Sequence, residues 1–140
     1  SDEGIATIAH IGLRPQQARF AGGYHVKGKN LDESKILLEN ALKFAQAGAF
    51  CVLMEGTISQ TASEITKALK VPTIGIGSGA NTDGQVLVWR DMLGFFDEFK
   101  PKFVKRYLNG ATLVRDAVGE YVREVKSGAF PSEEFEYKIK

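Results

Sequence analysis

The sequence predicts an α/β fold in which a parallel sheet is built from alternating strands and helices. Short apolar runs at residues 5–13, 49–54 and 73–76 have the composition of buried strands. Segments with apolar residues at helical spacing separate the second run from the first and from the third. Because parallel strands need a crossover between them, this order predicts right-handed β/α units.

The first run, residues 5–13, is rich in Ile, Ala and Thr and is closed by Pro15. This composition predicts a strand that is buried on both faces. Gly22, Gly23 and Gly28 then bracket a segment that is too short to hold a core. We interpret about residues 20–30 as a mobile hairpin or flap.

The next element is a helix with clear start and stop signals. Asn30 followed three residues later by Glu33 forms a capping box, and Gly48 ends the apolar periodicity. The predicted inner face consists of Leu37, Leu38, Ala41, Leu42 and Ala45.

The apolar run at 49–54 predicts the second strand, and Ser59 is placed to act as the N-cap of a second helix. Pro72 stops that helix, and residues 73–76 form the third strand. The inner face of the helix is predicted to carry Ala62, Ile65 and Leu69.

Residues 86–89 have the composition of a fourth strand. However, residues 77–85 are too few for a normal helical crossover. The alternative is a short helix that is capped by Asp83 and turns Val86, Leu87 and Met92 inward.

C-terminal helices are predicted over about residues 100–127, in two stretches at 102–108 and 111–126 that follow Pro101, with Gly128 capping the second. Their apolar faces are expected to cover the sheet or to meet another subunit. Residues 130–140 alternate charged and aromatic side chains, which is typical of a loosely packed terminus.

The bulk properties fit one folding unit over residues 1–140. The chain is 44% hydrophobic and has 18 basic against 17 acidic residues, so its charge does not favour nucleic acid or an anionic membrane as a partner. No apolar run approaches the ~20 residues of a membrane span, and the first residues do not resemble a signal peptide. Together with the single cysteine, Cys51, these features predict a cytoplasmic protein.

Glu55 is the strongest candidate for catalysis. It directly follows the apolar run at 49–54 and precedes Gly56, at the end of a strand where parallel α/β folds bind ligands. Burial disfavours the charged carboxylate and raises its pKa toward the range that suits a general base. The alternative is a structural glutamate that caps the next turn or pairs with a lysine.

Other polar residues support chemistry less directly. His10 lies within the first strand, where a hydrogen-bonded core imidazole is the common role, and His25 lies in the predicted flap. The two histidines lack metal-ligand spacing, so no metal site is predicted within this chain. The glycine-rich loop at 77–84 lacks both phosphate-binding fingerprints. The basic residues Lys100, Lys102, Lys105 and Arg106 are interpreted as a solvated helix face.

Six fragments in order give the chain a family resemblance. They are AHIGLRPQ at 9–16, GGYHVKGK at 22–29, VLMEG at 52–56, PTIGIGSGANTDGQVLVWRDMLG at 72–94, FKPKFVKRY at 99–107 and VKSGAFPSEEF at 125–135. Each fragment is weakly specific alone, but the ordered set closely resembles ketopantoate hydroxymethyltransferase along nearly the whole chain.

The resemblance implies a (β/α)8 barrel enzyme of pantothenate biosynthesis. Such an enzyme transfers a hydroxymethyl group from 5,10-methylenetetrahydrofolate to 3-methyl-2-oxobutanoate, with Mg2+ chelating the keto acid. By motif, Glu55 matches the glutamate that accepts the proton, and His10 matches a histidine expected to bind substrate. The resemblance also implies a homo-oligomer, a decamer in that family.

The family's magnesium ligands and its substrate lysine precede the region matched here. The resemblance therefore implies the C-terminal half of the barrel, about four β/α units plus C-terminal helices, which requires a complementary N-terminal half. One alternative is a non-catalytic half-barrel that self-associates to hide its open sheet edges. Another is a small doubly wound domain that binds a ligand near residues 77–84.

Overall fold

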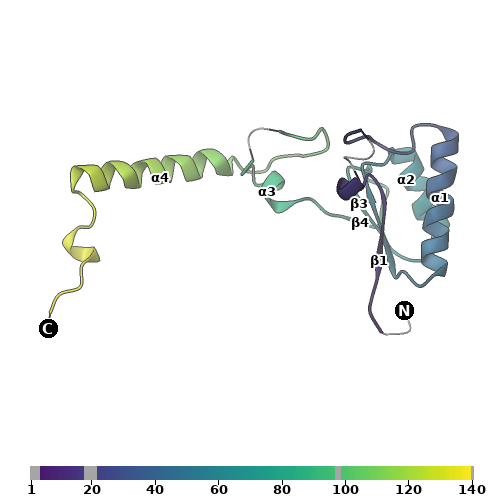
Figure 1. The fold of residues 1–140 in the computed structure, drawn as a ribbon, viewed down its shortest axis with the longest axis horizontal. Helices are drawn as coiled ribbons and strands as arrows, with labels where there is room; N and C mark the ends of the chain where they lie inside the picture. Colours follow the sequence, from purple (N-terminus) through teal and green to yellow (C-terminus); the bar gives the residue numbers. More distant parts are fainter. Residues whose placement is uncertain (1–3, 18–21, 97–98, 140) are drawn as a thin grey trace. The chain divides into compact units, whose positions relative to one another are not determined.

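The computed structural model describes residues 4–17, 22–96 and 99–139. They group into two compact units, Ser1–Leu87 and Val88–Lys140, which are considered separately (Figure 1). A single folding unit over residues 1–140 stays a prediction.

The first unit contains a four-stranded parallel sheet, which confirms the predicted α/β class. The strands follow one another across the sheet in chain order, without the reversal found in a doubly wound sheet. The first pairing runs from Ile8 opposite Cys51 to Gly12 opposite Glu55. The strands are β1 (Ile8–Gly12), β2 (Cys51–Glu55), β3 (Thr73–Ile76) and β4 (Gly84–Gln85).

Two helices, α1 (Leu31–Gln46) and α2 (Ser59–Ala68), lie together on one side of this sheet (Figure 1). Because side chains alternate along a strand, Ile11, Val52 and Met54 face the helices, whereas His10 and Glu55 face the other way. The core on the helix side consists of Ile11, Ala41, Val52, Met54, Ala62 and Ile65.

The prediction that the first strand is buried on both faces is wrong for the described structure. Within β1 the side chain of Ile11 is buried, but Ile8 is 49% exposed. The physical reason is that β1 lies at the edge of the sheet and turns Ile8 to the side opposite α1 and α2.

The capping box of α1 is confirmed, with one difference. The Oδ1 atom of Asn30 accepts from the backbone N–H of Glu33 at 2.9 Å. The Glu33 carboxylate accepts from the backbone N–H groups of Gly28 and Lys29, at 2.9 and 3.0 Å, rather than from that of Asn30. Glu33 therefore fixes the chain that leads into the helix, and these bonds lower its pKa.

Ser59 is not the N-cap of α2, contrary to the prediction. Ile58 occupies that position, and Ser59 is the first helical residue, with its hydroxyl donating to the Gln60 side chain. The backbone N–H of Ile58 donates to the carbonyl of Lys27, so the chain enters α2 already paired with the segment before α1.

Neither interpretation of residues 86–89 is correct. The strand β4 occurs two residues earlier and is reached by a loop, and the short helix α3 (Trp89–Met92) has Val88 as its N-cap. Asp83 does not cap that helix. Its carboxylate accepts from the backbone N–H and the hydroxyl of Thr73, at 2.8 and 2.9 Å, which fixes β4 beside β3 without a crossover helix.

The predicted hairpin is absent from residues 22–30, while residues 20 and 21 of the predicted flap lie outside the described residues. In its place, Lys27 forms a single parallel bridge with Thr57. The mobility of this segment stays a prediction.

In the second unit the helix predicted at 111–126 is confirmed as α4 (Gly110–Ser127), which Gly128 caps in a left-handed conformation. The helix predicted at 102–108 is wrong. The backbone N–H groups of Tyr107 and Gly110 donate instead to the carbonyls of Met92 and Leu93, so tertiary pairing replaces the helical pattern.

The terminal segment is loosely packed, as predicted, since residues 131–139 are all exposed. It contains the short 3-10 helix η2 (Glu133–Phe135), and the ring of Phe130 packs against Tyr121 and Phe135 at centroid distances of 5.6 and 5.5 Å. None of the helices in the described ranges is long and apolar enough to cross a membrane.

Candidate functional site

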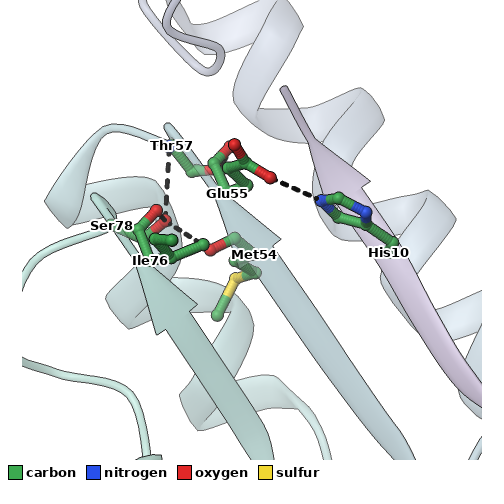
Figure 2. Close-up of polar contacts among 6 residues, drawn as sticks. All are labelled: His10, Met54, Glu55, Thr57, Ile76 and Ser78. Atoms are coloured by element: carbon green, nitrogen blue, oxygen red, sulfur yellow. Dashed lines mark hydrogen bonds and ion pairs between the residues drawn. The ribbon is translucent and has the colours of Figure 1, made fainter. Parts of the chain in front are cut away.

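Glu55 is the last residue of β2 and lies at the carboxyl end of the parallel sheet. On its own face of the sheet its neighbours are Gly12 on β1 and the buried Ile76 on β3. The backbones of Gly12 and Glu55 approach closely, since a Cβ atom added at Gly12 would lie 2.3 Å from the backbone oxygen of Glu55. The carboxylate of Glu55 points to His10, which lies two residues before Gly12 on β1 (Figure 2).

The structure therefore brings together the two residues that the sequence placed on separate elements. The Nε2 atom of His10 lies 3.2 Å from Oε2 of Glu55, and the side chains are 29% and 18% exposed. The contact is close enough for a hydrogen bond but is not aligned as one, and the buried Nε2 atom has no hydrogen-bond partner among the described residues. We interpret it as a charge contact that forms fully when the imidazole is protonated.

Burial raises the pKa of Glu55 above its ordinary value of 4.5, and the imidazole of His10 opposes the shift only in part. The cause is the partial loss of water around the carboxylate. A carboxylate with a raised pKa is a stronger base than one in water, so Glu55 is suited to accept a proton from a bound molecule. The raised pKa agrees with the shift expected from the sequence, whereas the role of Glu55 as a base stays a prediction.

Three neighbouring segments hold the backbone at Glu55. The carbonyl of Glu55 accepts from the N–H of Leu13 at 2.7 Å, and the N–H of Gly56 donates to the carbonyl of Ile76 at 2.9 Å. The carbonyl of Gly56 accepts from the N–H of Lys27 at 2.9 Å. The backbone that carries the carboxylate is therefore held by the residue after β1, by β3 and by the segment before α1.

Ser78 is a residue of this site that the sequence reasoning missed. It lies in the loop after β3, and its buried hydroxyl donates to the carbonyl of Met54 at 2.7 Å (Figure 2). The available signal was a small polar residue between Gly77 and Gly79. That pattern predicts a tight turn but does not say where the hydroxyl points.

The remaining candidates lie outside this arrangement. The Nε2 atom of His25 contacts the carbonyl of Gly22 at 3.2 Å, in an exposed position. The basic stretch lies in the second unit, where Lys100, Lys102 and Lys105 are exposed and the guanidinium of Arg106 donates to the carbonyl of Phe96.

A metal ion has no complete ligand set in the part of the chain that the structure describes. No group of three or more His, Cys, Asp or Glu side chains there could hold one. His10 and Glu55 supply two such groups but lack a third. The described residues by themselves therefore do not offer magnesium a full set of ligands.

Comparison with known proteins relates the chain to one family. The sequence model described as ketopantoate hydroxymethyltransferase matches residues 1–133. The chain is similar to the 3-methyl-2-oxobutanoate hydroxymethyltransferase of Campylobacter concisus, with 64% identity over 98% of this chain and 51% of that protein. It is also similar to the enzyme of the same name from Helicobacter hepaticus, with 54% identity over 97% of this chain and 52% of that protein. The enzyme of that name from Helicobacter pylori is 54% identical over 95% of this chain and 49% of that protein. The chain thus spans about half the length of these curated relatives.

Proposed function

We propose that this chain, which belongs to the ketopantoate hydroxymethyltransferase family, supplies the proton acceptor for hydroxymethyl transfer from 5,10-methylenetetrahydrofolate to 3-methyl-2-oxobutanoate. The observation that carries the proposal is the position of Glu55. It is a part-buried carboxylate with a raised pKa, held on a fixed backbone at the carboxyl end of a parallel sheet.

In the proposed reaction, the carboxylate of Glu55 removes the proton from carbon 3 of the keto acid. The electron pair of that C–H bond passes into the adjacent carbonyl group and forms an enolate. Water hydrolyses the methylene bridge of the folate, so that both of its C–N bonds break and tetrahydrofolate and formaldehyde form. Carbon 3 of the enolate then adds to the formaldehyde carbon, and the resulting alkoxide takes up the proton that Glu55 removed. The chain's own contribution to these steps is proton abstraction by a desolvated base.

His10 is proposed to contact the keto acid from the neighbouring strand. Its imidazole lies at the same end of the sheet as the carboxylate and is partly accessible. A protonated imidazole there would attract an anionic substrate and would also favour the ionised form of Glu55.

The rest of the site is proposed to come from the part of the relatives that this chain does not match. Strands in sequential order with both helices on one side have the arrangement of a barrel wall, which supports a half-barrel of about four β/α units. We propose that a complementary N-terminal half closes the barrel and carries the ligands of the expected Mg2+. A cytoplasmic homo-oligomer, a decamer as in the family, remains part of the proposal.

Proton exchange at carbon 3 tests the proposal. The full-length protein is incubated in water with Mg2+ and 3-methyl-2-oxobutanoate carrying deuterium at carbon 3, and loss of the deuterium is followed by NMR. Wild-type protein should exchange the label, and Glu55→Gln should slow exchange by about 100-fold or more without a comparable loss of substrate affinity. Exchange at the wild-type rate in Glu55→Gln would remove Glu55 from the mechanism.

The same assay separates this function from the alternative of a non-catalytic, self-associating half-barrel. Turnover of the keto acid and the folate by residues 1–140 alone would exclude that alternative. An inactive chain that gains activity when the N-terminal half is added would support the proposed division of the site.

A further inference from the structure

We infer that Ser78 is a positioning residue for Glu55: its hydroxyl ties together the two ends of the short backbone segment that carries the catalytic carboxylate. This inference rests on the proposed function and extends it to a residue on a different strand–loop unit.

The hydroxyl of Ser78 bonds to both sides of Glu55. It donates to the carbonyl of Met54, the residue before Glu55, at 2.7 Å. It accepts from the backbone N–H of Thr57, two residues after Glu55, at 3.3 Å. Figure 2 shows both bonds converging on one oxygen atom beside the strand end. A single side chain therefore bridges the backbone on both sides of Glu55 and Gly56.

A hydroxyl has one hydrogen, so the two carbonyls within reach compete for it. The carbonyl of Ile76 lies 3.3 Å from the Ser78 oxygen, whereas that of Met54 lies at 2.7 Å. The shorter bond is the stronger one, so the hydroxyl hydrogen is donated to the carbonyl of Met54, on the strand that carries Glu55.

Burial makes these bonds costly to lose. Ser78 is 1% exposed and Thr57 is 3% exposed, so water cannot readily replace the hydroxyl. Removal of the oxygen leaves the N–H of Thr57 without that partner and frees the turn after β2 to move.

The surrounding loop keeps the hydroxyl pointed inward. Gly77 and Gly79 flank Ser78 and have φ angles of 62° and 81°, which L side chains rarely adopt. At Gly79 an added Cβ atom would lie 2.5 Å from the Cβ of Ser59, so the loop packs closely on the start of α2. Two glycines thus give Ser78 a fixed orientation.

The test compares two buried hydroxyls at opposite ends of β3, in the full-length protein. Ser78→Ala removes the hydroxyl beside Glu55, and Thr73→Val removes one at the other end of the strand, where it is fully buried and bonds to Asp83. Exchange at carbon 3 of deuterated 3-methyl-2-oxobutanoate gives kcat and KM, and thermal unfolding gives Tm.

Both variants should lower Tm. Ser78→Ala alone should lower kcat for exchange by about five- to tenfold, with KM nearly unchanged, because a looser carboxylate is less often in the reactive position. In Ser78→Ala, the acid limb of the pH profile of kcat should also move to lower pH. Extra mobility admits water to Glu55, and hydration moves its raised pKa back toward 4.5. Thr73→Val should keep the wild-type kcat and pH profile.

The outcomes separate the two proposals. A wild-type kcat and pH profile in Ser78→Ala, with only Tm lowered, would overturn the positioning role and leave the proposed function intact. No exchange by the wild-type protein, or full exchange by Glu55→Gln, would overturn the proposed role of Glu55 and the role of Ser78 with it. If Ser78→Ala does not fold, Ser78→Cys provides the same comparison, since it keeps a side chain of similar size with a much weaker donor.

Discussion

Two carboxylates lie at opposite ends of the same sheet, and their surroundings are opposite in kind. Asp83 accepts from the N–H and the hydroxyl of Thr73, and these bonds lower its pKa below 3.8. Glu55 has the imidazole of His10 as its polar contact, and burial raises its pKa above 4.5. The hydrogen-bonded carboxylate of Asp83 holds β4 beside β3. The under-bonded carboxylate retains the basicity that chemistry can use.

The largest expected effect on stability comes from disrupting the close backbone packing at the end of the sheet that carries Glu55. Gly12 has a φ of 85°, and an added Cβ would lie 2.3 Å from the backbone oxygen of Glu55. Gly12→Ala should therefore lower the free energy of unfolding by about 3 kcal/mol, from backbone strain and overpacking together. Urea denaturation of the full-length protein measures the loss.

Gly128→Ala is the matched control for this variant. Gly128 has a φ of 74°, but a Cβ atom added there would have nothing within 4 Å. The substitution should therefore lower the free energy of unfolding by about 1 kcal/mol, from backbone strain alone. Equal losses in the two variants would show that close packing at Gly12 does not support the Glu55 backbone.

A smaller effect is expected where the helices begin. Asn30→Ala removes the side-chain cap of α1 and should cost about 1 kcal/mol of unfolding free energy. Ser59→Ala removes an exposed hydroxyl whose hydrogen bond goes to the neighbouring Gln60, so its cost should lie within about 0.5 kcal/mol of zero. Urea midpoints compare the two variants directly. Equal costs would mean that Ser59 caps α2 after all.

The smallest expected effect is a change in how Tm depends on pH. It tests the contrast between Asp83 and Glu55 most directly. Asp83→Asn should be less stable than wild type at neutral pH, and the difference should vanish as the pH falls from 3.8 through the lowered pKa of folded Asp83. Wild type should lose stability relative to Glu55→Gln as the pH rises from 4.5 through the raised pKa of folded Glu55. Curves with the same sign would contradict the contrast between the two carboxylates.

The sequence predicted those elements whose signals are local. Residues 73–76 were predicted with the bounds of β3, because a proline and glycines enclose a short aliphatic run. The start of α1 was predicted because Asn30 and Glu33 lie three residues apart, and that spacing alone defines the cap. The position of Glu55 at the end of β2 was predicted in the same way, from an apolar run that ends in a carboxylate, and its catalytic role stays a prediction.

The parts that could not be predicted depend on contacts between distant segments. The meeting of His10 with Glu55 requires the register of β1 against β2, which composition does not encode. The hydrogen bond from Ser78 to Met54 and the one from the backbone N–H of Thr73 to Asp83 likewise join separate elements. At residues 102–108 the helical pattern was present, but backbone pairing with Met92 and Leu93 nearby overrode it.

The edge position of β1 has a consequence for local opening of the fold. His10 belongs to β1, whose backbone pairs on one side only within the described sheet, while Glu55 belongs to a strand paired on both sides. Edge strands detach by small fluctuations that leave the remaining strands folded. In residues 1–140 alone, we therefore expect the His10–Glu55 pair to open together with β1 and without global unfolding. Amide hydrogen exchange should be faster in β1 than in β2.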